Sequence, residues 1–310
     1  MHFFAQQGPS VGSATLFFLA FAACLVAWAA IIERVAAGHP ILPYQPRRRV
    51  PWEFWDLLAV ALFYIAVAVA VFHSGRYIFG LVPSAPLHDA APGETSTVNP
   101  IIQVLTSGNW VAMVLCAATA IVVAPVAEEF FFRVLLQGWL EKVDRTWRRR
   151  FSCARRWMPA GAMPIFVSSL FFAAQHVRLA APAVNAQLFT MLLASDGIAR
   201  VLAIIFSVVF LRYRVGATAL DFGWAPKEIL ADVRLGLFAF MAIATPIFGS
   251  LLIVSQLLPK EFAPDPVPIF FFAIALGLLY NRTHRAAPSI ALHMALNVTS
   301  LAMVFLSSFG

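Results

Sequence analysis

The stretch that decides the fold is Val111–Leu136, which reads VAMVLCAATAIVVAPVAEEFFFRVLL. It is long and apolar enough for a membrane-spanning helix, since about 20 such residues cross a hydrocarbon core of roughly 30 Å. Glu128, Glu129 and Arg133 interrupt this run within six residues. A charge near the bilayer centre costs about 2.5–3.5 kcal/mol on insertion scales, so these groups need partners, water or a function.

The composition of the whole chain also indicates a membrane protein. Of its 310 residues, 61% are hydrophobic and 12% are charged, whereas soluble domains average about 45–50% and 25%. We expect an all-α fold, a polytopic transmembrane helix bundle of about eight spans. The predicted spans are Ala14–Glu33, Trp55–His73, Trp110–Leu140, Gly161–His176, Asn185–Leu211 (with a break near Asp196-Gly197), Leu235–Leu257, Val267–Tyr280 and Ala287–Ser307.

The basic residues sort by predicted loop, and this sorting orients the bundle. Of 22 lysines and arginines, two fall within predicted spans (Arg133 and Arg200) and three in loops on one side (Arg76, Arg178 and Lys260). The rest lie on the opposite side, an asymmetry typical of the positive-inside rule. We therefore expect an integral protein of a bacterial inner membrane, in contact with the lipid bilayer, with cytoplasmic basic loops and both termini outside. Because topology accounts for the net charge of +7, no nucleic acid is expected as a partner.

The spacing of the first polar group suggests a division of labour. Glu129 and Arg133 are four residues apart and share a helix face, so they can form an ion pair. Glu128 points about 100° away from Glu129 around the helix. We therefore expect Arg133 to neutralise Glu129 and to leave Glu128 free for chemistry.

Two later spans carry further polar side chains. His176 follows Phe172 by four residues, and His293 and Asn297 are four apart on one face of an otherwise apolar helix. Such groups must face protein or water rather than lipid. A carboxylate, two imidazoles and an amide can deprotonate water and stabilise a developing oxyanion. This combination suits hydrolysis of a peptide bond without a covalent intermediate.

These three motifs, in this order, resemble those of the CAAX-protease and bacteriocin-processing (CPBP, or Abi) family of intramembrane glutamic endopeptidases. The family pattern is Glu-Glu-x-x-x-Arg, Phe-x-x-x-His and His-x-x-x-Asn. It corresponds here to Glu128–Arg133, Phe172–His176 and His293–Asn297. The resemblance implies an enzyme that hydrolyses a peptide bond in a protein or peptide at the membrane without a cofactor. The long insertion between His176 and His293 leaves open whether the substrate is lipid-modified.

The resemblance also implies a role for each motif residue. The catalytic set would comprise Glu128 as general base, His176 as its assistant, and His293 and Asn297 as the oxyanion hole, with Glu129, Arg133 and Phe172 as structural support. We divide the chain accordingly into N-terminal spans with an outer loop (residues 1–109) and a protease-like core (residues 110–310). The core contains an insertion around residues 183–266, in which Asp221–Arg234 is expected to form a short amphipathic helix on the membrane surface.

Two alternatives stay open at this point. A glutamate and two histidines could bind zinc with water as the fourth ligand. Zinc is disfavoured because His-Glu-x-x-His is absent and no two histidines are four apart on one helix. The same polar residues could also belong to a non-catalytic protein of this fold, such as an immunity protein, a scaffold, or a transporter with a proton or solute site.

Overall fold

The computed structural model describes residues 11–45, 49–78, 104, 108–151, 158–176, 186–257 and 266–309. The regular elements of this part are all helical. They are α1 (Val11–Ala36), α2 (Phe54–Ile78), α4 (Trp110–Ala118), η2 (Thr119–Val123), α5 (Ala124–Glu128), η3 (Glu129–Gln137), α6 (Gly138–Arg150), α8 (Ala162–Ala174), α9 (Ala186–Val215), η4 (Pro226–Glu228), α10 (Ile229–Leu257), α11 (Pro266–Thr283) and α12 (Ala286–Phe309). The predicted outer loop Pro83–Pro100 lies outside the described residues.

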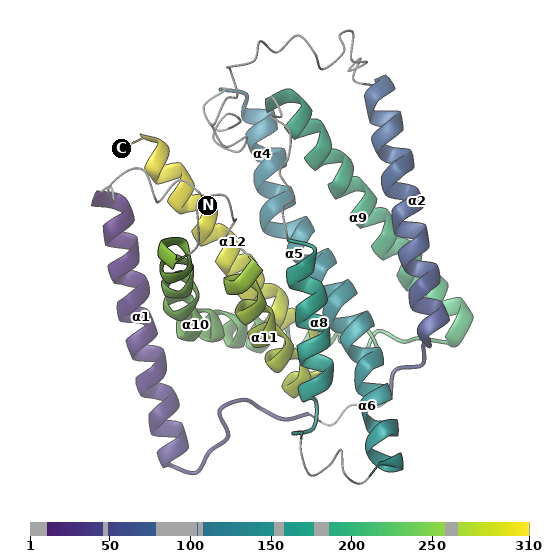
Figure 1. Cartoon of the computed structure of the whole chain (residues 1–310), viewed down its shortest axis with the longest axis horizontal. Helices are drawn as coiled ribbons and strands as arrows, with labels where there is room; N and C mark the ends of the chain where they lie inside the picture. Colours follow the sequence, from purple (N-terminus) through teal and green to yellow (C-terminus); the bar gives the residue numbers. More distant parts are fainter. Residues whose placement is uncertain are drawn as a thin grey trace.

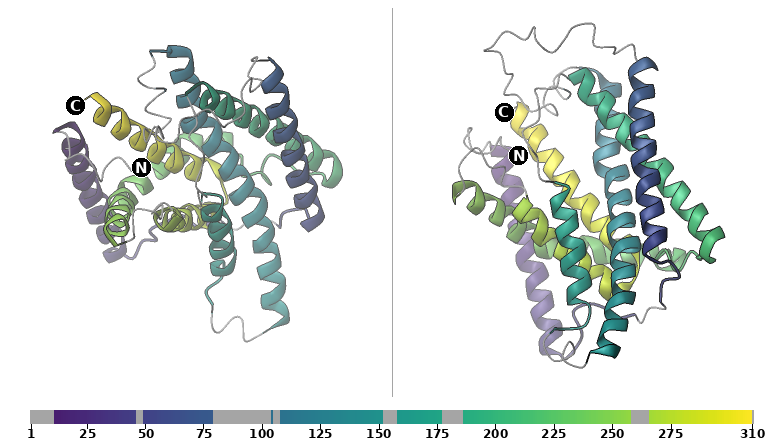
Figure 2. Two further views of the ribbon diagram at one scale, coloured as in Figure 1. Left: turned by 45° about the horizontal axis from the view of Figure 1, so that its top comes forward. Right: turned by 45° about the vertical axis from the view of Figure 1, so that its right-hand side comes forward.

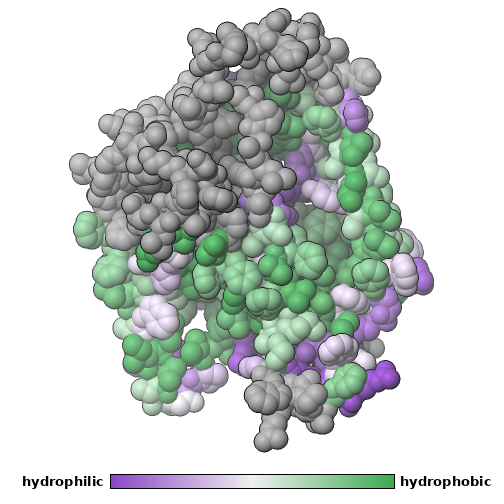
Figure 3. All heavy atoms as spheres, in the orientation of Figure 1, coloured by the Kyte–Doolittle hydropathy of each residue, from purple (hydrophilic) through white to green (hydrophobic). Residues whose placement is uncertain are grey.

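The helices have the length and composition of membrane spans. Within the described residues, six helical stretches are long and apolar enough to cross a bilayer, and α8 and α11 are shorter apolar helices. Large apolar side chains point outward from several of them, among them Phe18, Leu62, Val114, Leu202 and Phe271. On the face in Figure 3 they cover most of the coloured surface, and hydrophilic residues gather along its lower edge. This apolar exterior suits lipid as the surrounding medium, and the predicted polytopic helical bundle is confirmed.

A continuous rod, residues 110–150, crosses the centre of the bundle and is formed by α4, η2, α5, η3 and α6 (Figure 1). Around it, α2 packs along α9, α8 packs along α11, and α10 packs against both α1 and α12. The rod itself contacts α8, α9, α11 and α12, and Figure 2 shows the same arrangement from two further directions. The rod therefore presents its polar residues to four helices that come from later parts of the chain.

The basic connections gather at one end of the bundle. The ends of α1, α6 and α11 all lie in the lower part of Figure 1, whereas α1 begins and α12 ends at the upper part. The basic residues of the last turns of these helices, among them Arg34, Arg148 and Arg282, lie at this lower end. The alternation agrees with the expected threading of the chain, and the side of the membrane that each end faces stays a prediction.

Two local predictions are wrong. Helix α9 runs without a break through Asp196 and Gly197, because the Asp196 carboxylate is paired within the helix and Gly197 packs against Thr119 of the rod. The segment Asp221–Arg234 forms no separate surface helix. Instead it contains a turn, the short 3-10 helix η4 and the first residues of α10.

Candidate active site

The central rod changes from α to π geometry on both sides of the glutamate pair. The segments η2 and η3 are π-helical, with only the five residues of α5 between them. π-Helical turns are rare and are frequently found at functional sites. Glu128 ends α5 and Glu129 begins η3, so the two carboxylates lie at the junction between α and π geometry.

Pro125 explains one feature of the first wide turn. The N–H of Ala124 donates to the carbonyl of Thr119, five residues earlier. Pro125 cannot make the next bond of this kind, to Ala120, because proline has no N–H. The carbonyl oxygen of Ala120 instead accepts a hydrogen bond from Nδ2 of Asn297 at 2.7 Å. Pro125 therefore leaves the carbonyl of Ala120 available, and the bond from Asn297 to this carbonyl attaches the last helix, α12, to the rod.

The two oxygens of the Glu128 carboxylate have different surroundings. Oε1 accepts a hydrogen bond from Nη1 of Arg200 at 2.7 Å. Oε2 lies 3.9 Å from Nε2 of His176 and 3.8 Å from Nε2 of His293. These distances are too long for direct hydrogen bonds. Oε2 thus faces both imidazole rings, and the Glu128 side chain is 8% exposed.

His176 is held by its own helix end. Helix α8 ends at Ala174, and Nδ1 of His176 lies 2.8 Å from the carbonyl oxygen of Phe172. A carbonyl can only accept, so Nδ1 carries the proton of this hydrogen bond. In the neutral ring, Nε2 then presents its lone pair toward Glu128. The imidazole is 30% exposed, which makes it the more accessible of the two rings.

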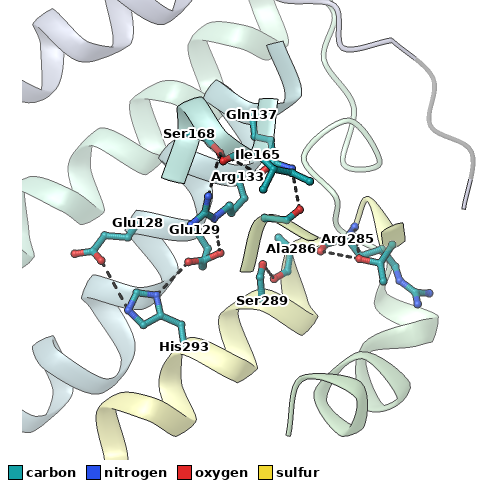
Figure 4. A network of polar contacts seen from close by, with 12 residues as sticks. Glu128, Glu129, Arg133, Gln137, Ile165, Ser168, Arg285, Ala286, Ser289 and His293 are labelled. Atoms are coloured by element: carbon teal, nitrogen blue, oxygen red, sulfur yellow. Dashed lines mark hydrogen bonds and ion pairs between the residues drawn. The ribbon is translucent and has the colours of Figure 1, made fainter. Parts of the chain in front are cut away.

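The second glutamate forms the buried half of the site (Figure 4). Oε1 of Glu129 lies 3.1 Å from Nδ1 of His293, and Oε2 lies 3.5 Å from Nε of Arg133. The Glu129 and Arg133 side chains are completely buried. Nη1 of Arg133 also donates to Oγ of Ser168 at 3.1 Å. The Glu129–Arg133 pair predicted from the spacing is present, and it is tied to His293 on one side and to α8 on the other.

The ring of Phe172 lies among the charged and polar groups. It is 1% exposed, and its centroid lies 5.0 Å from the ring centroid of His176 and 5.7 Å from that of His293. The guanidinium carbon of Arg133 lies 5.1 Å from the same centroid. Phe172 therefore fixes both imidazoles by packing and provides an aromatic face for the buried cation.

A polar line continues from Arg133 toward the lower end of the rod. Oγ of Ser168 donates to Oε1 of Gln137 at 3.3 Å, and Nε2 of Gln137 donates to the carbonyl of Gly277 at 2.9 Å. Glu141, one turn further, accepts from Asn281 at 3.0 Å. The buried cation is thus part of a network that joins the rod to α8 and α11 (Figure 4).

Glu128 also has a cationic partner, which the spacing of the motifs did not predict. Its partner Arg200 comes from α9, where Nε of Arg200 also lies 2.6 Å from Oδ2 of Asp196. The other oxygen of Asp196 accepts from the hydroxyl of Tyr64 on α2 at 3.1 Å. The sequence held a signal for this chain of contacts. Asp196 and Arg200 are opposite charges four apart in an apolar span, as Glu129 and Arg133 are.

All seven residues singled out from the motifs lie in one connected region. Glu128, His176 and His293 converge around Oε2 of Glu128, while Asn297 lies one helical turn after His293 and donates to the carbonyl of Ala120 in the rod. Within the part of the chain that the structure describes, no group of three or more His, Cys, Asp or Glu side chains is arranged to hold a metal ion. The geometry provides two carboxylates, two imidazoles, an amide donor and two guanidinium groups.

Comparison with protein families identifies the chain. The family model described as "Type II CAAX prenyl endopeptidase Rce1-like" matches residues 109–225 and 223–299, more than half of the chain and all three motifs. No curated protein and no solved structure matches it. A protease family whose members act at the membrane fits the apolar helices of this fold. The chain belongs to the Rce1-like family of type II CAAX prenyl endopeptidases.

Proposed function

We propose that this protein is an intramembrane endopeptidase in which Glu128 activates a water molecule to hydrolyse a peptide bond. The observation that carries the proposal is the position of Glu128 Oε2, which faces Nε2 of His176 at 3.9 Å and Nε2 of His293 at 3.8 Å. Placing several ionisable side chains together within membrane spans costs free energy. A hydrolytic site would give a functional reason for keeping them there.

The activation of water follows from the lone pairs of Glu128 and His176. Both Oε2 of Glu128 and Nε2 of the neutral His176 accept hydrogen bonds, and a water can bridge polar atoms more than 3.5 Å apart. Such a water donates both of its hydrogens, so its own lone pairs point toward a substrate carbonyl. As the oxygen attacks the carbonyl carbon, Glu128 takes one proton, and general-base catalysis of this kind contributes about 10²–10⁴-fold.

The oxyanion would be stabilised from α12. Nδ2 of Asn297 carries two hydrogens, of which one is donated to Ala120, and we assign the second to the oxyanion. Because Glu129 accepts from Nδ1 of His293, Nε2 can donate only when the ring carries both protons. A cationic His293 also balances the cluster, in which three carboxylates (Glu128, Glu129 and Asp196) meet two guanidinium groups (Arg133 and Arg200).

Collapse of the tetrahedral intermediate completes the reaction. The carbon–nitrogen bond breaks, the proton held by Glu128 passes to the leaving amine, and Glu128 returns to its carboxylate form. Family membership favours a C-terminal Cys-aliphatic-aliphatic-X segment with a prenylated cysteine as the substrate. We further infer that the protein lies in a bacterial inner membrane with its basic loops in the cytoplasm, since those loops gather at one end of the bundle.

The test uses purified protein in lipid nanodiscs and a quenched fluorescent peptide that ends in a farnesylated Cys-aliphatic-aliphatic-X sequence. The unmodified peptide is assayed beside it. Glu128→Gln and His176→Ala should abolish or strongly reduce cleavage, whereas Glu33→Gln and His39→Ala, at exposed positions, should not. Cleavage that survives both site substitutions would remove the assigned site. A folded wild-type protein that cleaves neither peptide would favour the non-catalytic role.

A further inference from the structure

Building on the proposed function, on which this inference rests, we propose that Arg200 is a positioning residue for Glu128. It holds Oε1 of the carboxylate and thereby turns Oε2 toward the two imidazoles. Asp196 and Tyr64 in turn hold Arg200. These three residues lie on α9 and α2, outside the three motifs that define the site.

The first argument is the unequal use of the two carboxylate oxygens. The hydrogen bond from Arg200 goes to Oε1, at 2.7 Å, the short distance of a charge-assisted hydrogen bond. Oε2 is left to face His176 and His293. A carboxylate attached through rotatable bonds would otherwise exchange its oxygens and change its direction. The bond to Arg200 selects one orientation, the one in which a water can be shared with His176.

The second argument is the shape of the guanidinium group. Nη1 of Arg200 points to Glu128, while Nε points to Asp196 at 2.6 Å. Two directed donors in a rigid plane allow one side chain to bridge two carboxylates, which a lysine ammonium does not reproduce. Tyr64 donates to the second oxygen of Asp196. A series of contacts that begins at Tyr64 on α2 thus holds the Glu128 carboxylate in its orientation.

The third argument is that Glu128 has a cation of its own. Arg133 is paired with Glu129 at 3.5 Å and bonded to Ser168, so each glutamate has its own arginine. The Arg200 side chain is 18% exposed and that of Glu128 is 8% exposed, and this burial limits screening of the pair by water. Arg133 holds the buried glutamate, and Arg200 acts on the one we assign as the base.

The approach of α9 to the rod depends on a small residue. A Cβ atom at Gly197 would lie 3.3 Å from Oγ1 of Thr119, a contact tighter than most side chains accept. The glycine therefore lets α9 lie close enough for Arg200 to reach Glu128. This close approach lies one turn before Arg200 on the same helix, which connects the backbone of α9 to the geometry of the base.

The experiment compares steady-state cleavage of the farnesylated peptide by Arg200→Gln, Arg200→Lys, Asp196→Asn and the wild type, with Arg214→Gln as the control on an exposed position of α9. Misplacement of a catalytic group by about 1 Å can cost on the order of 10²-fold. We expect kcat of Arg200→Gln to fall by about that factor while KM stays within about twofold. Arg200→Lys should rescue part of the loss, because it keeps the charge and loses the two-pronged geometry.

Coupling between the variants provides the second readout. Asp196→Asn should lower kcat several-fold in the wild type and should have no further effect in Arg200→Gln, because Asp196 acts through Arg200. A rise in KM with unchanged kcat would mean that Arg200 binds substrate, and would overturn the proposal. If Arg200→Gln fails to fold, as judged by its melting temperature, unchanged kcat in both Arg200→Lys and Asp196→Asn would overturn it equally.

Failure of this inference differs from failure of the proposed function. If Glu128→Gln cleaved the peptide at the wild-type rate, the assignment of Glu128 as the base would be rejected, whatever the activity of the Arg200 variants. An inactive Glu128→Gln together with fully active Arg200 and Asp196 variants would leave the base in place and reject only its positioning by α9.

Discussion

Glu128 and Glu129 are neighbours in the chain, but they have different arginine partners and differ in how deeply their side chains are buried in the protein. Glu129 is fully buried between Arg133 and His293, whereas Glu128 faces the more accessible His176 and is paired with Arg200. Burial removes water from an ion pair, so its partners must replace the lost hydration. The two positions should therefore respond differently to substitution, one through stability and the other through turnover.

Removal of the buried cation is the first test of this difference. Arg133→Ala leaves the Glu129 carboxylate without its arginine, and loss of one partner of a buried pair costs about 3–5 kcal/mol. We expect a marked fall in the melting temperature of the detergent-solubilised protein, together with loss of cleavage. Arg214→Ala, at an exposed position, is the control. A variant as stable as the wild type would show that the pair does not support the fold.

Asn297 should behave in the opposite way. Asn297→Ala removes the donor assigned to the oxyanion, and loss of one such donor costs roughly 2.7–4 kcal/mol of transition-state stabilisation, or about 10²–10³-fold in kcat. It also leaves the carbonyl of Ala120 without its partner, for which about 1–3 kcal/mol of stability would be lost. The variant should still fold. The measurement is kcat for cleavage of the farnesylated peptide. Unfolding of Asn297→Ala beside a stable Arg133→Ala would reverse the assigned roles.

At this scale the sequence predicted the contacts that follow from local spacing or from a motif. Glu129 and Arg133 are one helical turn apart, so their pairing could be predicted from position alone. Arg200 is 72 residues from Glu128, and no local pattern relates the two. The sequence shows that Glu128, as a charged residue in a membrane span, needs a partner. Which residue becomes its partner depends on how α9 packs against the rod.

At the scale of the helices, apolar runs predicted where the spans lie. They did not predict the geometry within them. The π-helical turn at Thr119–Val123 involves Pro125 and a bond to Asn297, which is 177 residues from Ala120. The continuity of α9 likewise depends on contacts with other helices, because Asp196 and Gly197 alone are typical of a helix break.

Gly197 provides a test of how α9 is placed. Gly197→Leu introduces a side chain where even a Cβ would lie 3.3 Å from Thr119 Oγ1, so α9 should move away from the rod. We expect kcat to fall by about tenfold or more, since a misplaced group of this kind can cost up to about 10²-fold. Gly249→Leu on α10 is the matched control, because a Cβ there meets nothing within 4 Å. Equal activity of the two variants would contradict a role for close packing of α9.

At the scale of the whole molecule, a bundle with an apolar exterior encloses a line of charged and polar groups. Glu128, Glu129 and Asp196 each lie beside a guanidinium group, which lowers the free-energy cost of keeping these charges within the membrane. The composition and the sorting of basic residues were sufficient to predict the bundle. The packing order of its helices was not predictable, because nearly every span is apolar and many pairings would bury similar surfaces.

A metal-free mechanism predicts indifference to chelators. Cleavage of the farnesylated peptide should be unchanged after incubation with EDTA or 1,10-phenanthroline, because Glu128, His176 and His293 are assigned to proton transfer and hydrogen bonding rather than to coordination. Metal analysis of the purified protein is the accompanying measurement. Stoichiometric zinc whose removal abolishes cleavage, and whose return restores it, would replace this mechanism with a zinc-dependent one.

The order of the helices along the chain has a consequence for biosynthesis. Of the helices that form the site, the ribosome delivers the rod first, with Glu129 and its arginine already together. Helix α8 follows, then α9 with the cation for Glu128, and only at the end α12 with His293 and Asn297. Glu128 and Glu129 thus each have an arginine partner before the last imidazole and the amide arrive. A nascent chain can therefore insert into the bilayer before the residues that we assign to the oxyanion hole are in place.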